Sequence, residues 1–225
     1  MSLKSGGAAA ALAAFAGISP SFAASGKEEA PSSLFLDPET REWVPYTRAR
    51  ARRYFKAKGQ VPGEFLRQTV PFRTTEKPGT VIIDANQHFL YFVQENNTAI
   101  RYGIGVGRDG FGWAGIVNVG RTAEWPRWTP PAEMVARDPL AAKWAKGMPG
   151  GPTNPLGARA IYLYEGNRDT IYRIHGTIEP WSIGLNISSG CIRMVNDDVI
   201  DLHSRIKVGA KVVVLKQNAA ILNGV

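Results

Sequence analysis

Short apolar runs with turn residues between them constrain the fold of this chain more than any other feature. Residues 80–84 and 88–93 are rich in Val, Ile, Phe and Tyr, and only Ala85-Asn86-Gln87 separates them. Two such runs joined by a short polar link predict a β-hairpin. The same pattern recurs at residues 99–106, 159–164, 170–175 and 211–215. From Thr80 onward the chain is therefore expected to be mainly β.

One segment after these strands has the spacing of a helix. Val199, Leu202 and Ile206 recur at helical intervals, Asn196 is placed to act as the N-cap, and Gly209 marks the end. Shorter helical turns are expected near residues 132–136 and 139–146. His203 falls inside the main helix and is interpreted as structural, whereas His88 is interpreted as a surface or edge histidine at a strand start.

Composition places the chain among soluble globular proteins. Hydrophobic residues make up 44% and charged residues 20% of the 225 residues, which allows one domain with a substantial core and excludes disorder throughout. The formal charge of +8 favours an anionic partner, such as nucleic acid, a membrane surface or an acidic cell-wall polymer. The charge is spread along the chain except for a basic run at residues 48–58, which we interpret as a solvated face.

The first 23 residues have the pattern of a secretory signal peptide. Lys4 precedes a short apolar stretch at residues 8–18, and Ser21-Phe22-Ala23 supplies small residues at the cleavage position. The apolar stretch is shorter than the roughly 20 residues that span a membrane, and no cysteine follows it for a lipid anchor. An unprocessed anchor or a flexible tail is the alternative. Residues 24–77 are expected to form an N-terminal leader, and residues 217–225 a C-terminal tail.

The most chemically suggestive stretch contains the only cysteine, Cys191, with His175 lying 16 positions before it. A thiol becomes a nucleophile when a neighbouring base or positive charge favours the thiolate. Gly190 removes a side chain beside the sulfur, so backbone N–H groups can approach a developing oxyanion. Spacing alone leaves this interpretation equal to that of a small buried cysteine with an unrelated histidine.

The complete string decides between the two. It begins with His175-Gly176, continues through a loop, and ends with Ser188-Ser189-Gly190-Cys191 followed by Ile192-Arg193-Met194. This resembles the signature of the L,D-transpeptidase catalytic domain, the YkuD-type family, in its Gram-negative periplasmic branch. The resemblance covers roughly residues 78–216. It implies a mainly-β catalytic domain of the L,D-transpeptidase type, sandwich-like or barrel-like, with one or a few short helices.

The family's roles transfer by position. The resemblance implies that Cys191 is the nucleophile, that His175 is the general base and acid, and that the backbone carbonyl of Gly176 orients the imidazole. It further implies that the N–H groups of Gly190 and Cys191 contribute to the oxyanion hole. We expect Arg193, Ser188, Ser189 and Trp181 to bind the substrate. Other branches carry histidine where this chain has Ser189, which leaves acceptor recognition open.

The implied reaction is acyl transfer on peptidoglycan. The nucleophile would attack a tetrapeptide stem, release D-alanine and form a thioester, which an amine then resolves. An amine of a second stem gives a 3→3 cross-link, an amine of an envelope protein gives a wall-tethered protein, and water makes the enzyme an L,D-carboxypeptidase. The family needs no metal or organic cofactor. The expected partners are peptidoglycan stem peptides and an envelope protein as acceptor, with no nucleic acid and no transmembrane segment after signal cleavage. The Ile-Arg-Met branch, the signal peptide and the missing lipobox imply a periplasmic location.

Several alternatives stand beside this interpretation. A cysteine peptidase is one, and a thiol-redox protein is another, although redox chemistry usually needs a second cysteine nearby. A non-catalytic peptidoglycan-binding envelope protein would retain the fold without activity, and nucleic-acid binding rests on charge alone. The segment at residues 125–156, rich in Trp, Pro and Gly, is interpreted either as a lid or wall of a substrate groove or as a surface insertion.

Overall fold

The computed structural model describes residues 34–36, 43–45, 59–108 and 113–215. The chain divides into two units, residues 1–46 and 47–225. In the first unit, strands β1 (Leu34–Leu36) and β2 (Trp43–Pro45) pair antiparallel. The predicted signal peptide, the basic run at residues 48–58 and the predicted C-terminal tail at 217–225 lie outside the described residues.

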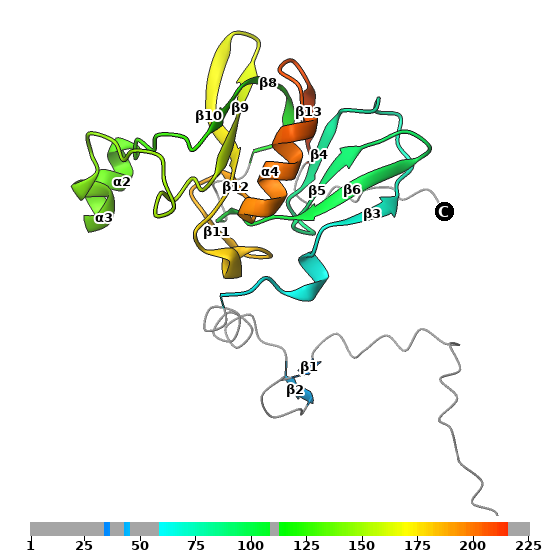
Figure 1. Ribbon diagram of the computed structural model, residues 1–225, viewed down its shortest axis with the longest axis horizontal. Helices are drawn as coiled ribbons and strands as arrows, with labels where there is room; N and C mark the ends of the chain where they lie inside the picture. Colours follow the sequence, from blue (N-terminus) through cyan, green and yellow to red (C-terminus); the bar gives the residue numbers. More distant parts are fainter. Residues whose placement is uncertain (1–33, 37–42, 46–58, 109–112, 216–225) are drawn as a thin grey trace, which may run out of the picture. The chain divides into compact units, whose positions relative to one another are not determined.

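The second unit is built on a nine-stranded sheet with the order β12-β10-β9-β8-β13-β4-β5-β6-β3, shown in Figure 1. Its strands are β3 (Gln68–Pro71), β4 (Val81–Asp84), β5 (Phe89–Val93), β6 (Thr98–Gly103), β8 (Gly115–Glu124), β9 (Arg159–Glu165), β10 (Arg168–His175), β12 (Ile192–Arg193) and β13 (Lys211–Val214). Two further strands, β7 (Val106–Gly107) and β11 (Asn186–Ser188), pair with each other in parallel. The mainly-β prediction and the predicted hairpins are confirmed.

The last strand holds the sheet together. β13 pairs in parallel with β4, where Val212 lies opposite Val81, and antiparallel with β8, where Val212 lies opposite Val117. The strands β4 to β6 and the strands β8 to β10 each form antiparallel pairs along the sequence, and β13 joins these two groups. A segment near the C-terminus therefore lies in the middle of the sheet.

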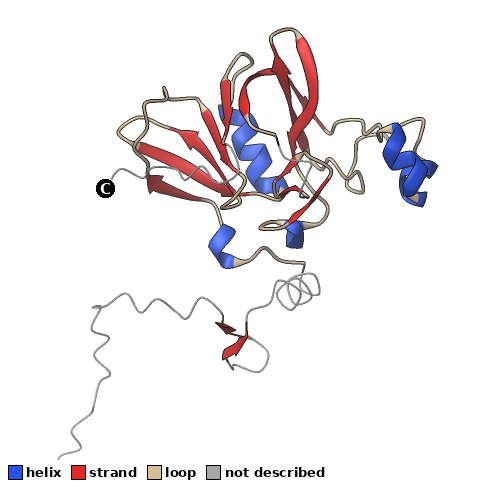
Figure 2. Ribbon diagram, turned by 180° about the vertical axis from the view of Figure 1, so that it is seen from behind, coloured by secondary structure: helices blue, strands red, loops and turns tan. Residues whose placement is uncertain are grey.

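Helix α4 (Asn196–Arg205) covers one face of the sheet, as the views from both sides show (Figures 1 and 2). Its Val199 and Leu202 are fully buried against the strands, together with Ile161 and Ile174. Burial of each such aliphatic side chain stabilises the fold by about 1.5–3 kcal/mol. The apolar residues at helical spacing in the sequence are therefore those that attach α4 to the sheet.

Two details of the sequence interpretation are wrong. Asn196 is not the N-cap, because Val195 occupies that position and Asn196 Oδ1 instead accepts a hydrogen bond from the backbone N–H of Ala158 at 2.9 Å. His88 is not a surface residue. It is 6% exposed, adopts a positive φ of 62°, and its Nε2 lies 2.6 Å from Asn186 Oδ1. In both cases a partner distant in the sequence determines the role of the side chain.

The segment before residue 78 contributes to the sheet. β3 is its outermost strand, paired antiparallel with β6, and the 3-10 turn η1 (Gly63–Phe65) precedes it. The Phe65 ring lies 5.5 Å from that of Phe89, and a Cβ built on Gly103 would lie 2.4 Å from Phe65 Cβ.

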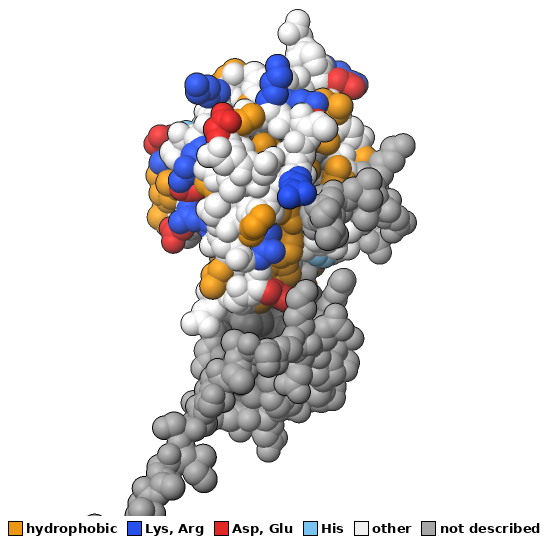
Figure 3. All heavy atoms as spheres, turned by 90° about the vertical axis from the view of Figure 1, so that its right-hand side faces the viewer, with side chains coloured by type: hydrophobic (Ala, Val, Ile, Leu, Met, Phe, Trp, Pro, Cys, Tyr) orange, Lys and Arg blue, Asp and Glu red, His pale blue; other side chains and the backbone are white. Residues whose placement is uncertain are grey.

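On the side of the molecule drawn in Figure 3, basic side chains are spread among acidic and apolar ones.

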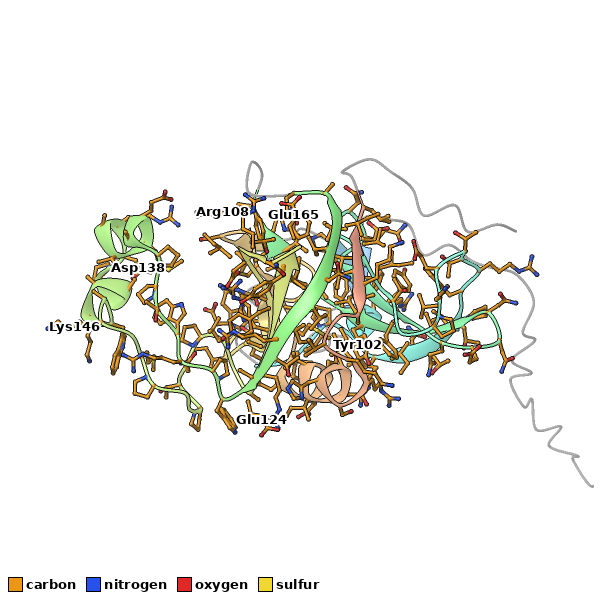
Figure 4. All side chains as sticks on the ribbon, turned by 90° about the horizontal axis from the view of Figure 1, so that it is seen from above. Tyr102, Arg108, Glu124, Asp138, Lys146 and Glu165 are labelled. Atoms are coloured by element: carbon orange, nitrogen blue, oxygen red, sulfur yellow. The ribbon has the colours of Figure 1, made fainter. Side chains whose placement is uncertain are left out.

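An insertion between β8 and β9 lies to one side of the sheet. It carries the short helices α2 (Ala132–Arg137) and α3 (Pro139–Lys143), and Figure 4 shows Asp138 and Lys146 in this segment, away from the strands. Asn154 is fully buried and holds the insertion together, because its Nδ2 donates to the carbonyls of Pro126 and Pro149. No helix within the described residues has the length and apolarity needed to span a membrane.

Candidate active site

The predicted nucleophile and base lie on neighbouring strands. β10 ends at His175 and runs parallel to β12, with Ile174 opposite Ile192 and His175 opposite Arg193. The same register places Cys191, the residue before β12, opposite Arg173. Because alternate residues of a strand project from the same face, Arg173, His175 and Cys191 share one face of the sheet. Ile174 and Ile192 project from the other face into the core.

His175 is a buried imidazole whose tautomer is determined by its neighbour. Its Nδ1 lies 2.6 Å from the backbone carbonyl oxygen of Gly176, and the side chain is nearly inaccessible to solvent. A carbonyl oxygen only accepts hydrogen bonds, so Nδ1 carries the proton and Nε2 presents its lone pair. Burial lowers the pKa of His175 to about 4, and the charges of Arg193 and Arg173 act in the same direction. The imidazole is therefore an uncharged base at neutral pH.

Close backbone packing fixes the carbonyl that holds His175. The N–H of Gly176 donates to the carbonyl of Arg159 at 3.0 Å. A Cβ on Gly176 would lie 2.2 Å from Asn196 Oδ1, so this position requires glycine. The same Asn196 oxygen would lie 2.2 Å from a Cβ on Gly157, where φ is +63°. The Asn196 side chain therefore packs against both Gly157 and Gly176, next to the histidine. Its place in the sequence did not reveal this role.

The turn that carries Cys191 is braced by Ser188. The Ser188 hydroxyl donates to the carbonyl oxygen of Cys191 at 2.6 Å and accepts from the N–H of Gly190 at 3.2 Å. Gly190 has a φ of 111°, a backbone conformation that favours glycine. Since Ser188 is buried and its hydroxyl is engaged inside the turn, it is not presented to a ligand in this conformation. The N–H of Gly190 is likewise directed to Ser188 and not to a vacant oxyanion position.

The thiol of Cys191 is half-buried and uncharged at rest. Burial raises its pKa, while a hydrogen bond from the backbone N–H of Arg173 and the charges of Arg173 and Arg193 oppose part of that increase. A raised thiol pKa and a lowered imidazole pKa together favour a neutral thiol–imidazole pair over a thiolate–imidazolium pair. Such a pair can form a nucleophile when the imidazole accepts the thiol proton during attack on a carbonyl.

The other predicted site residues differ in their accessibility. Arg193 is half-buried, forms an ion pair with Glu179 at 2.9 Å, and exchanges two backbone hydrogen bonds with Gly105. Ser189 is exposed, and its hydroxyl accepts a hydrogen bond from Arg137 of α2 at 3.2 Å, which connects the insertion to the nucleophile turn. Trp181 is buried within the 3-10 turn η2 (Pro180–Ser182).

An open hollow of about 340 Å³ lies beside the segment that follows His175. Its walls come from that segment, from the start of α4 and from the insertion: Pro152, Thr177, Ile178, Pro180, Val195, Asn196 and Asp197. Among the described residues, no group of three or more His, Cys, Asp or Glu side chains is arranged to hold a metal ion. The ionisable side chains brought together at the site are the thiol, the imidazole and the nearby arginines.

Comparisons with known proteins show the family to which the chain belongs. The model of the L,D-transpeptidase catalytic domain, YkuD, matches residues 78–214, which is more than half of the chain. The chain belongs to this family. Among curated relatives, the probable L,D-transpeptidase YbiS of Escherichia coli is 35% identical over 147 residues, a match that covers 61% of this chain and 44% of YbiS. The matched region thus spans less than half the length of YbiS.

Two solved structures align with part of this chain. A Brucella melitensis protein, described as a probable carnitine operon oxidoreductase, is 50% identical and covers 70% of this chain and 98% of its own, with a TM-score of 0.48. An L,D-transpeptidase from Mycobacterium smegmatis is 18% identical and covers 61% of this chain and 58% of its own, with a TM-score of 0.44.

Proposed function

We propose that this chain is a peptidoglycan L,D-transpeptidase of the Gram-negative periplasm. The observation that carries the proposal is the placement of Cys191 and His175 on one face of two parallel strands, with the imidazole tautomer held by Gly176. That arrangement, in a chain of this family, suits acyl transfer through a thioester.

In the first half of the proposed reaction, His175 Nε2 accepts the thiol proton while the Cys191 sulfur attacks the carbonyl of the third residue of a tetrapeptide stem. The bond from that carbonyl to D-alanine breaks, and His175 returns the proton to the departing amine. A thioester to Cys191 remains. In the second half, an incoming amine loses a proton to His175 and attacks the thioester, and the released sulfur regains the proton.

The negative charge on the tetrahedral intermediate needs hydrogen-bond donors. We infer that the N–H of Cys191 supplies one, and that the N–H of Gly190 supplies another after it leaves the Ser188 hydroxyl. Loss of one such donor typically costs about 100- to 1,000-fold in rate. Arg193 and Ser189 are proposed to contact the peptide at the rim of the site, with Trp181 supporting the loop from beneath.

The acceptor amine is proposed to come from a second stem, which gives a 3→3 cross-link, or from an envelope protein. The exposed rim of the nucleophile turn, where Ser189 contacts α2, provides an accessible approach for such a group. Hydrolysis would instead make the protein an L,D-carboxypeptidase.

Mass spectrometry of products tests the proposal. Purified protein and its Cys191→Ala and His175→Ala variants would be incubated with disaccharide-tetrapeptide, and with disaccharide-tripeptide as a substrate that lacks the leaving group. Wild-type protein should release D-alanine, give a 3→3 dimer and carry an acyl adduct on Cys191, whereas neither variant should do so. Tripeptide without dimer would assign hydrolysis. Unchanged tetrapeptide with wild-type protein would contradict the proposal and favour a binding role.

A further inference from the structure

A row of four residues crosses the sheet and ends at the nucleophile. Arg121 of β8 lies opposite Tyr162 of β9, and Tyr162 lies opposite Arg173 of β10. The parallel register of β10 and β12 in turn places Arg173 opposite Cys191. Directly opposite residues project from the same face of a sheet. The two arginines and the tyrosine therefore form one line beside the thiol, on the face that carries His175.

The side chains of this row are stacked on one another. Tyr162 is 6% exposed, and the Cζ atoms of Arg121 and Arg173 lie 3.3 Å and 4.4 Å from the centre of its ring. Asp169 accepts hydrogen bonds from both terminal nitrogens of Arg173, at 2.7 Å and 2.9 Å. Stacking on an aromatic face and bidentate pairing both hold a guanidinium in a defined orientation.

An irregularity in β10 makes this arrangement possible. Asp169 lies opposite Tyr164 and Arg173 opposite Tyr162, so three residues of β10 face a single residue of β9. Ile171 lies at the centre of the bulge with a φ of 67° and is 73% exposed. A β-branched residue in the left-handed region is strained, and bulges often direct side chains near active sites. Here the bulge brings the Asp169 carboxylate onto Arg173.

The row carries an uncompensated positive charge. Asp169 pairs with Arg173, and Glu179 pairs with the nearby Arg193. Arg121 is exposed, and among the described residues no carboxylate lies within ion-pair distance of it; at longer range its charge helps to lower the pKa of Asp169. One guanidinium thus remains available to an anionic group that approaches along the sheet face.

We propose that Arg121, supported by Tyr162 and by the Arg173–Asp169 pair, binds a carboxylate of the acyl-donor peptide on the sheet face that carries Cys191. This inference rests on the proposed function and names a substrate contact of the same site. A guanidinium binds a carboxylate through two parallel hydrogen bonds, and a tetrapeptide donor offers the carboxylates of diaminopimelate and of the terminal D-alanine. In the strand order β12-β10-β9-β8, Arg121 lies three strands from the strand that follows the thiol, so it would contact a donor carboxylate at a distance from the scissile bond.

The first test combines one substitution with changes in the substrate. D-alanine release would be measured for wild type and Arg121→Gln, using tetrapeptide donors whose carboxylates are amidated one at a time. We expect Arg121→Gln to raise KM for the unmodified donor by roughly 10- to 100-fold, as for loss of a charged hydrogen bond, with little change in kcat. For one amidated donor, the two proteins should have equal KM values, because the contact is already lost.

The matched control is Arg168→Gln. Arg168 lies at the turn of the same β9–β10 hairpin, where it pairs with Glu165, and its side chain is exposed. This variant removes the same charge but should leave KM unchanged for every donor. Thermal unfolding of both variants checks that the fold is retained. A KM for Arg121→Gln equal to that of wild type, or one raised equally for all donors, would overturn the proposed contact.

A binding measurement keeps this result separate from the question of turnover. Calorimetry with the unmodified tetrapeptide would compare Cys191→Ala with the double variant Cys191→Ala/Arg121→Gln. Weaker binding to the double variant by about 10-fold or more supports the subsite, even if wild-type protein releases no D-alanine and the proposed function fails. Equal binding by the two proteins rejects the subsite, whatever the activity of the wild type.

Discussion

At the residue scale, both reacting side chains rest in their uncharged forms. Burial raises the pKa of Cys191 and lowers that of His175 to about 4, so the thiol is not ionised in advance. The proton must therefore move as the sulfur attacks. A resting thiol of this kind is also a weaker target for oxidation and alkylation than a preformed thiolate.

The pKa of His175 predicts an unusual acid limit for activity. The base must be unprotonated, so kcat/KM should stay level as the pH falls from 7 to about 5 and should halve near pH 4. Arg193→Gln removes the largest charge contribution to this lowered pKa and should move the limit upward. The measurement is kcat/KM against pH for both proteins. A wild-type limit near 6.5, the ordinary value for histidine, would contradict the prediction.

Ser188 and Ser189 offer a matched pair of substitutions. Ser188→Ala leaves the buried carbonyl of Cys191 without its 2.6 Å donor, and an unsatisfied buried group costs about 1–3 kcal/mol. We expect a lower melting temperature and a kcat reduced by roughly 10-fold or more. Ser189→Ala removes only an exposed contact to Arg137 and should cost less in both measurements. A larger loss from Ser189→Ala would be inconsistent with the brace assigned to Ser188.

At the element scale, α4 is attached to the sheet by apolar packing and by a charged cluster. Tyr102 of β6 donates to Asp201 at 2.6 Å, and Figure 4 shows Tyr102 beside the helix. Arg67 contributes ion pairs to Asp201 and, at 3.7 Å, to Asp198. This cluster connects the start of β3 to the helix that follows the nucleophile.

Asp198 within this cluster should destabilise the protein at neutral pH. Burial raises its pKa to about 6; Arg67 opposes the increase, and Asp201 and Asp197 add to it. A raised folded-state pKa contributes stability below the unfolded value, near 3.8, and this contribution is lost as the pH rises through about 6. Asp198→Asn should therefore raise the free energy of unfolding by about 1–2 kcal/mol at pH 7.5 but not at pH 4.

Urea unfolding at the two pH values measures this effect. Asp197→Asn is the control, because Asp197 is exposed in the same turn and its replacement should change stability by less than about 0.5 kcal/mol. An Asp198→Asn protein that is less stable than wild type at pH 7.5 would show that the contact with Arg67 outweighs the cost of burial.

The sequence predicted elements that depend on local patterns and missed features that depend on distant partners. Alternating and apolar runs located β4, β5, β9 and β10, because their signal lies within each strand. The capping role given to Asn196 was wrong, because its oxygen serves Ala158, a partner 38 residues away. The sequence analysis did not single out Arg173, whose place on the face of His175 follows from the strand register. The row from Arg121 to Arg173 required the register across three strands, which no local pattern specifies.

At the scale of the whole molecule, the sheet extends beyond the region that the family model matches. β3 and η1 lie before residue 78, yet β3 covers the edge of β6 and Phe65 packs on Phe89. A fragment of residues 78–215 should lose about 3 kcal/mol or more relative to residues 59–215, because it loses the half-buried ring of Phe65 and a strand. It should also associate through the bare edge of β6.

Chemical unfolding and light scattering of the two fragments check this expectation. Equal stability and a monomeric state for both fragments would show that the segment before residue 78 is dispensable. A loss of stability found only in the shorter fragment would show that the segment before residue 78 belongs to the catalytic unit.

The central position of β13 also has a consequence for the order of folding. A ribosome delivers the chain from its N-terminus, so hairpins such as β4–β5 and β9–β10 can form early, but their two groups cannot join until residues 211–214 arrive. Pairing β13 with β4 closes a loop of nearly the whole domain, which is a slow, non-local step. The two halves therefore acquire a common core only once residues 211–214 are available to pair with both β4 and β8.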